Sequence, residues 1–321
     1  MIAKDGDRGP EFSRIVKHQL NGILAALASA RSLNGDNLRV YVINLAVARQ
    51  RLAHMERILG DAGIRFERFD AVDASRAIAH RCFKLIPPMV ERRWTADELG
   101  CLFSHYEVWC RIAAGPDRLG AVMEDDLFVD PRLKSLVDGD IKLPCDADLI
   151  KLETVAAKTS VSRLARYGSQ AFRVHRLRSL HCGTGAYLVS RVAAKKLIGL
   201  IELFDIPIDR ALFSASHPVG SQMNVYQVVP ALAIQNKHLA DASRRPELNT
   251  SIGRARDLAD ELQRAMLRTK SMALSECNVR HITPARHRLL SALVRRLQSA
   301  KKNILQKELV VPFALGSRIR E

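Results

Sequence analysis

The sequence predicts an α/β protein, with a Rossmann-like, mostly parallel mixed sheet flanked by helices and a basic helical region at its C-terminal end. Three patterns predict this fold class. A strand, a helix and a second strand follow one another early in the chain, further short apolar strands alternate with helices, and the pattern becomes helical and basic from about residue 252. We therefore expect an N-terminal extension over residues 1–37, an α/β domain over 38–251 and a helical region over 252–321.

The first strand-helix-strand unit follows a polar lead-in that carries one possible helix, Phe12–Arg31. Leu38–Ile43 is rich in β-branched residues, as strands are. Ala48–Leu59 reads as a helix that stops at two glycines, and Ile64–Phe69 reads as the next strand. A unit of this kind favours parallel pairing of its two strands.

A second helix is expected to begin at Thr95, because Thr95 and Glu98 have the spacing of a capping box. Its apolar residues recur at helical spacing, which indicates that one face packs on the sheet. Leu119–Met123 then has the length and apolar character of a buried strand. Further strands are expected at residues 149–152, 172–174, 186–189 and 226–229, and a further helix at 192–203.

The charge balance indicates a polyanion among the ligands. The chain has 50 Lys and Arg against 34 Asp and Glu, a net charge of +16, and 18 basic but only 8 acidic residues follow Asn236. Nucleic acid, anionic lipid and phosphorylated substrates all match such a charge. The six cysteines have no zinc-ligand spacing and no disulfide framework, and no apolar run approaches the roughly 20 residues of a membrane span. We therefore expect a cytoplasmic protein.

Three adjacent acids, Glu124, Asp125 and Asp126, directly follow the buried strand. The carboxyl edge of a parallel sheet is where α/β proteins bind ligands, and three carboxylates there repel one another unless a cation is present. In extended geometry Glu124 and Asp126 point to one side and Asp125 to the other. Glu124 and Asp126 are therefore candidate ligands of Mg²⁺ or Mn²⁺ bound together with a nucleotide diphosphate. For an isolated triplet, an acidic turn without a ligand is the alternative.

The C-terminal region contains a basic amphipathic helix that is expected to begin at Thr283 and Pro284. It has three interpretations: it lies on an anionic membrane surface, it binds nucleic acid, or its apolar stripe packs on the α/β domain. Phe313 is the only aromatic residue after position 252, so base stacking has little to use.

Motifs on both sides of the triplet occur in a fixed order. Those before it are Val42-Ile43-Asn44-Leu45 with Arg51 and Met55, Phe69-Asp70-Ala71-Val72-Asp73, and Glu98-Leu99-Gly100-Cys101 with Ser104, His105 and Trp109. Those after it are Gly185-Ala186-Tyr187-Leu188-Val189-Ser190, Pro207-Ile208-Asp209, and Pro230 with Gln235. In this order, over about two thirds of the chain, they resemble glycosyltransferase family 25, the lipopolysaccharide-type β-galactosyltransferases and their relatives.

The resemblance implies a GT-A fold, a UDP-sugar donor and a divalent metal. It also implies an inverting transfer, most often of galactose or glucose, onto a lipid-linked oligosaccharide of lipopolysaccharide or lipooligosaccharide biosynthesis. With such an acceptor, we expect the protein at the inner face of the cytoplasmic membrane, with its basic C-terminal helix on the anionic surface and no nucleic-acid partner.

The resemblance further implies roles for individual residues, and these have structural alternatives: a cap, an Asx turn or an ion-pair partner for the Asn and acidic residues, and a structural or surface residue for Arg51 and His105. The candidates for donor binding are Asn44, Arg51, Asp70, Asp73, Ser104, His105 and Asp125. An inverting transfer also needs a base for the acceptor hydroxyl, for which Asp209 is the first candidate and Glu153 the second. A catalytically inactive GT-A-like scaffold and a basic nucleic-acid-binding protein are the competing hypotheses.

Overall fold

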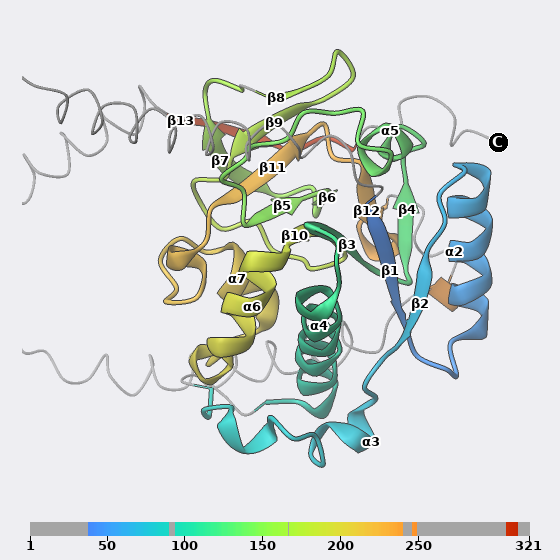
Figure 1. Ribbon diagram of the computed structural model, residues 1–321, viewed down its shortest axis with the longest axis vertical. Coiled ribbons are helices and arrows are strands. Elements are labelled where there is room, and N and C mark those ends of the chain that lie inside the picture. Colours follow the sequence, from blue (N-terminus) through green and yellow to red (C-terminus); the bar gives the residue numbers. More distant parts are fainter. Residues whose placement is uncertain (1–37, 90–93, 166, 240–245, 249–305, 314–321) are drawn as a thin grey trace, which may run out of the picture.

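The computed structural model describes residues 38–89, 94–165, 167–239, 246–248 and 306–313. Its centre is an eight-stranded sheet in the order β2-β1-β3-β10-β5-β11-β9-β8 (Figure 1). Two predicted helices, Phe12–Arg31 and the basic helix that begins at Thr283, lie outside the described residues.

The first strand-helix-strand unit forms as predicted. Its elements are β1 (Arg39–Asn44), α2 (Arg49–Asp61) and β2 (Glu67–Asp70). β1 pairs in parallel with β2 on one side and with β3 (Leu119–Glu124) on the other, which places Asn44 opposite Asp70 and Ile43 opposite Glu124. The carboxyl ends of three neighbouring strands therefore meet at one edge of the sheet.

Helix α4 (Ala96–Ala114) leads into β3 and begins with the predicted capping box. The Glu98 amide donates to Thr95 Oγ1 over 3.2 Å, and the Thr95 amide donates to the Glu98 carboxylate over 3.1 Å. Between β2 and α4 lie the short helices α3 (Ala74–Ala77) and η1 (Phe83–Leu85). The cap therefore fixes where α4 begins.

The sheet is mixed, because two of its strands run against the others. β10 (Ala186–Ser190) lies between β3 and β5 (Leu149–Lys151) and is antiparallel to both. β11 (Val225–Val229) is parallel to β5, β9 (Arg173–Arg176) is antiparallel to β11, and β8 (Tyr167–Gly168) is antiparallel to β9. The sheet is therefore mixed as predicted: β2, β1, β3, β5, β11 and β8 run in one direction, and β10 and β9 run in the other.

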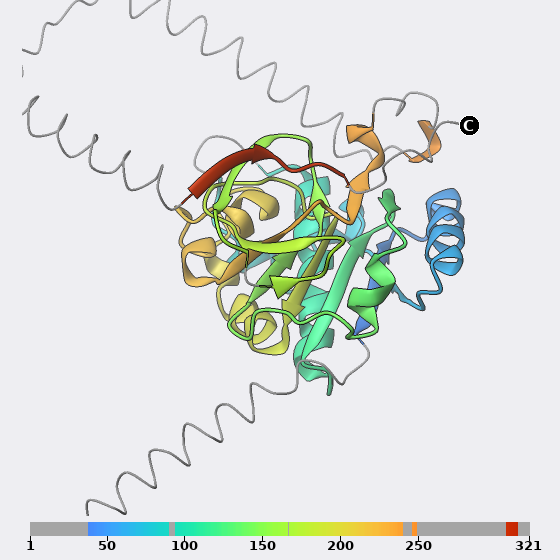
Figure 2. The same ribbon diagram turned by 90° about the horizontal axis from the view of Figure 1, so that it is seen from above.

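Two small sheets complete the β structure. One contains β4 (Leu127–Val129), β12 (Ala233–Gln235) and β6 (Glu153–Thr154). In the other, β7 (Lys158–Ser162) pairs with β13 (Gln306–Val310), the red strand in Figure 2. The sequence pattern predicted a helical region from residue 252 to the end of the chain, and for residues 306–310 that prediction is wrong. Pairing with β7 gives these residues backbone partners that a local sequence pattern does not reveal.

The remaining helices lie mostly after β10. The predicted helix at 192–203 is α6 (Arg191–Gly199) followed by the turn η2 (Ile201–Leu203). The others are α5 (Leu133–Val137), α7 (Ile208–Phe213), η3 (Gly220–Gln222), η4 (Asn236–His238) and η6 (Pro246–Leu248). Among the described residues, no helix is both long enough and apolar enough to cross a bilayer.

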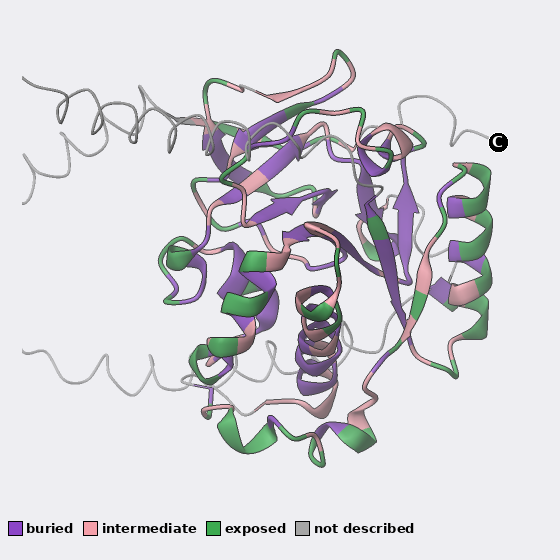
Figure 3. Ribbon diagram, in the orientation of Figure 1, coloured by how far each residue is buried: buried purple, intermediate pink, exposed green. Residues whose placement is uncertain are grey.

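The core has two halves, one on each face of the large sheet. Tyr41 and Ile43 of β1 pack toward α4, α6 and α7, while Val40 and Val42 pack toward α2 and α5. Alternate residues of one strand are thus buried on opposite faces, which explains why these strands read as continuous apolar runs. In Figure 3 the strands of the sheet are mainly buried, whereas α2 and α6 expose their outer sides.

Candidate active site

The acidic triplet lies at the carboxyl edge of the sheet, beside the ends of β1 and β2. Glu124 is the last residue of β3, and Asp125 and Asp126 form the turn into β4. A pocket opens next to Glu124 and Asp125, between the end of β1, the loop after β2 and the first half of α4. Of the predicted residues, those that line it are Arg51, Asp73, Ser104, His105, Glu124 and Asp125.

Asp125 is held by the first strand-helix unit. Asn44 Nδ2 donates to Asp125 Oδ2 over 2.6 Å, and Arg51 Nε lies 3.0 Å from Asp125 Oδ1. Burial raises the pKa of Asp125 despite the opposing effects of Arg51 and Asn44. Asn44 Oδ1 in turn accepts from Arg68 Nε over 2.9 Å. Three of the predicted donor-binding residues, Asn44, Arg51 and Asp125, therefore form one network.

Glu124 and Asp126 converge on one amide group, that of Gln235. Gln235 Nε2 donates to Glu124 Oε2 over 2.8 Å and to Asp126 Oδ1 over 3.1 Å. The two carboxylates thus share a side, as strand alternation predicts, while Asp125 turns toward Arg51. Gln235 belongs to the last of the sequence motifs, although the motif alone predicts no role for it in the site. Its contact with the triplet depends on the tertiary structure, which places it at the end of β12. In the sequence, only the motif points to this residue.

The pKa values of Glu124 and Asp126 are shifted in opposite directions although the two carboxylates are neighbours. Burial acts to raise the pKa of Glu124, but the hydrogen bond from His105, together with Lys237 and Thr184, lowers it to about 2. Burial and then the charge of Glu124 raise the pKa of Asp126 to about 7. A buried carboxylate with a raised pKa, Asp126, and a partly exposed one, Glu124, share one amide N–H and together form a ligand set that fits a hard divalent cation.

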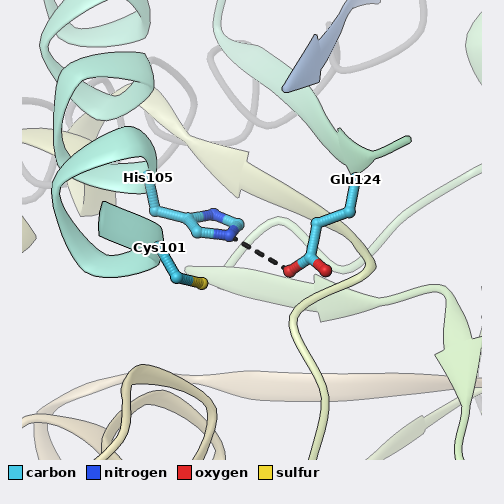
Figure 4. Close-up of side chains that lie close together, drawn as sticks. All are labelled: Cys101, His105 and Glu124. Atoms are coloured by element: carbon cyan, nitrogen blue, oxygen red, sulfur yellow. Dashed lines mark hydrogen bonds and ion pairs between the residues drawn. The ribbon is translucent and has the colours of Figure 1, made fainter. Parts of the chain in front are cut away.

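His105 lies beside Glu124 on the helix side of the pocket. His105 Nε2 is 3.3 Å from Glu124 Oε1, and Thr184 Oγ1 donates to the same oxygen over 2.8 Å. Cys101, one helical turn before His105, completes a group whose possible ligand atoms all lie within 4.8 Å of one another (Figure 4). This cluster sits on the pocket wall, and His105 is 1% exposed.

The other predicted donor-binding residues have structural contacts. Ser104 Oγ donates to the Gly100 carbonyl over 2.6 Å and accepts from the Val72 amide over 2.9 Å, which ties α4 to the loop after β2. Asp73 caps α3, and the hydrogen bond from Ser75, then that from the Arg76 amide, lowers the pKa of Asp73. Asp70 pairs with Arg68 over 2.9 Å on the exposed rim, outside the residues that line the pocket.

The two base candidates lie behind the loop Gly183–Gly185. Glu153 is fully buried, pairs with Lys151 Nζ over 2.8 Å and accepts from the Gly185 amide over 2.7 Å. Asp209, which is 5% exposed, accepts from the Gly183 amide over 3.0 Å. Burial raises the pKa of Glu153 despite Lys151. Neither lines the pocket, and together they hold the loop that carries Thr184 to Glu124.

The protein has a mixed sheet flanked by helices, and a pocket at the carboxyl edge of this sheet is lined by acids, an imidazole and an arginine. This arrangement is typical of a ligand-binding α/β enzyme. Residues 37–212 match the sequence profile of the family described as glycosyltransferase family 25 (LPS biosynthesis protein). Because this match covers more than half of the chain, the protein belongs to glycosyltransferase family 25 and is a glycosyltransferase.

Two of the following three curated relatives are named as glycosyltransferases, and the third is named for lipooligosaccharide biosynthesis. The chain is 28% identical over 291 residues to the lacto-N-neotetraose biosynthesis glycosyltransferase LgtB of Neisseria gonorrhoeae, covering 85% of this chain and 99% of the relative. It is 30% identical over 212 residues to LgtE of the same organism, covering 62% of this chain and 75% of the relative. It is 26% identical over 210 residues to the lipooligosaccharide biosynthesis protein lic2B of Haemophilus influenzae, covering 62% of this chain and 76% of the relative.

Proposed function

We propose that this enzyme transfers galactose or glucose from a UDP-sugar to a lipid-linked oligosaccharide of lipopolysaccharide or lipooligosaccharide biosynthesis, on a GT-A fold and with inversion. The names of the relatives support the acceptor class. The observation that carries the proposal is the convergence of Glu124 and Asp126 on Gln235 at the carboxyl edge of the sheet.

Glu124 and Asp126 would hold Mn²⁺ or Mg²⁺, with Gln235 turning its amide away or offering its oxygen. A divalent ion bound there supplies Lewis-acid stabilisation for the diphosphate leaving group. The chain's own groups do the rest of the binding. Arg51 lines the pocket and brings a positive charge toward the phosphates, while Asp125, which Asn44 holds by a hydrogen bond, offers a carboxylate to the nucleoside.

The acceptor hydroxyl must lose its proton as it attacks the anomeric carbon. Asp209 is our first candidate for this base, because it is 5% exposed whereas Glu153 is 0% exposed. Like Glu153 it lies behind the Gly183–Gly185 loop, and it would reach the acceptor only after that loop moves. Glu153 is the second candidate. It is fully buried and its Oε1 is bound to Lys151, so it would act only after the Gly183–Gly185 loop moves.

Release of UDP from UDP-galactose with and without Mn²⁺ tests the function. The wild type should release UDP only with a divalent ion, whereas Asp126→Asn and Glu124→Gln should fall to near background because each loses a ligand. Asp61→Asn, an exposed acid at the end of α2, is the matched control and should keep full activity. Asp209→Asn should lower kcat with little change in metal affinity.

Two results would contradict this function. Equal UDP release by the wild type and Asp126→Asn would refute the metal role. Absence of release from a panel of nucleotide sugars, with each donor tested beside a lipooligosaccharide acceptor, would favour an inactive scaffold.

A further inference from the structure

A line of buried rings leads from the core to Glu124. Trp109 and His105 lie one helical turn apart on α4, and Tyr187 faces them from β10. Trp109 Nε1 donates to the Tyr187 hydroxyl over 2.9 Å, and the same hydroxyl is 2.9 Å from His105 Nδ1. Trp109 and Tyr187 are 0% exposed and His105 is 1% exposed, so water does not compete for these atoms.

The chemistry of the three side chains favours one placement of the hydrogens. An indole N–H only donates, so the Tyr187 oxygen accepts from Trp109. The Tyr187 hydroxyl has one hydrogen, and donation to His105 Nδ1 gives it a partner. His105 Nδ1 is then an acceptor, and the ring carries its hydrogen on Nε2, which faces Glu124 Oε1.

The packing keeps this line in register. The rings of His105 and Tyr187 stack with centroids 5.7 Å apart at 27°, and Phe213 meets Tyr187 edge-on at 6.0 Å. The Tyr187 hydroxyl therefore stays opposite Nδ1. A hydrogen on Nε2 also disfavours a thiophilic metal in the Cys101, His105 and Glu124 cluster, because Nε2 is the nitrogen that Figure 4 shows facing the carboxylate.

We propose that Tyr187, supported by Trp109, is a positioning residue for the transferase: it selects the His105 tautomer that donates to Glu124. His105 and Thr184 then occupy Glu124 Oε1, and Glu124 Oε2 is left on the side shared with Asp126. This inference rests on the proposed function, in which Glu124 is a metal ligand. Partners behind metal ligands typically change metal affinity about 10- to 100-fold when they are removed.

A double-mutant cycle on Mn²⁺ affinity, measured by titration of the purified full chain, tests the tautomer role. In the wild-type background, Tyr187→Phe should weaken Mn²⁺ binding about 10-fold. His105→Gln should keep most of the affinity, because its amide N–H can replace Nε2–H, whereas His105→Ala should not. In the His105→Gln background Tyr187→Phe should have no more than about a twofold effect, because an amide has no tautomer to select.

The controls separate this role from folding. Tyr226→Phe removes a hydroxyl that donates to Asp146 over 2.8 Å elsewhere on the domain, and it should leave Mn²⁺ affinity unchanged. An equal loss from Tyr187→Phe in both His105 backgrounds would overturn this inference and leave the proposed function standing. A wild-type protein that does not bind Mn²⁺ would overturn both.

Discussion

At the scale of single residues, the site depends on a pair of like charges that the fold forces together. Glu124 and Asp126 accept from one amide nitrogen, and the pKa of Asp126 is raised to about 7 as a result of burial and of Glu124. Without a cation this arrangement works against folding. The site is therefore pre-formed at the expense of stability, which bound metal would restore.

Asp126→Asn should make this loss of folding stability measurable. The ordinary pKa of an Asp in an unfolded chain is about 3.9. Because the folded pKa is raised, stability from this group is present at low pH, falls as the pH rises from about 4 to about 7, and is lost above that. Asparagine carries no charge, so the variant should melt a few degrees higher than the metal-free wild type at pH 8, at roughly 2–4 °C per kcal/mol.

The gain in melting temperature should shrink as the pH is lowered toward about 4, and Mn²⁺ should stabilise the wild type but not the variant. Thermal melts followed by circular dichroism across this pH range check both points. A variant that is less stable than the wild type at pH 8 would show that Asp126 contributes more through its hydrogen bonds than it costs through repulsion.

At the scale of elements, the loop Gly183–Gly185 connects the buried acids to the site. Gly183 has φ = +91°, and a Cβ at Gly185 would lie 2.6 Å from Glu153 Oε2. Glu153 cannot move aside, because Lys151 and the Gly185 amide hold its other oxygen. The loop therefore tolerates only glycine where it passes over this carboxylate.

Gly185→Ala should destabilise the protein by about 1–3 kcal/mol, because the added methyl group overpacks a fixed neighbour. It should also lower activity, since the same loop carries Thr184 to Glu124. Gly60→Ala on α2 is the matched control: a Cβ there meets nothing within 4 Å, so stability should be unchanged or rise. Urea unfolding of the two variants gives the comparison, and equal stability would contradict the steric role of Gly185.

Sequence patterns predicted the elements better than their partners. The capping box at Thr95, the buried strand before Glu124 and the first strand-helix-strand unit depend on residues close together in the chain, and the structure has all three. The antiparallel entry of β10, the pairing of β13 with β7 and the contact of Gln235 with the triplet join residues far apart. Local periodicity carries no information about such pairs.

At the scale of the whole molecule, the end of the chain returns to the catalytic domain. β13 pairs with β7, Thr154 Oγ1 donates to the Val311 carbonyl over 2.6 Å, and the Ala231 amide donates to the Pro312 carbonyl over 2.8 Å. We propose that the basic segment before β13 binds anionic membrane at the cytoplasmic face, where a lipid-linked acceptor would lie. Removing residues 283–304 and keeping β13 is therefore the appropriate deletion.

This deletion should reduce binding to vesicles that contain anionic lipid at low ionic strength, because each Lys or Arg near such a surface contributes about 1 kcal/mol. Added salt should reduce binding of the full chain in the same way. Neutral vesicles are the control, and co-sedimentation is the measurement. Unchanged binding after the deletion would assign the membrane contact to another surface.

The pairing of β13 with β7 also determines how a membrane surface bound to the preceding segment would act on the enzyme. Leu248 is buried against Phe128 and Ile234, and Gln306 pairs with Ser162 of β7, so the described residues on both sides of 249–305 are held by the domain. A chain segment with one fixed end lets its domain swivel freely. A segment that is fixed at both ends limits the rotation of its domain as well as its distance from the partner. A partner that binds residues 249–305 would therefore restrict the directions in which the catalytic pocket can face.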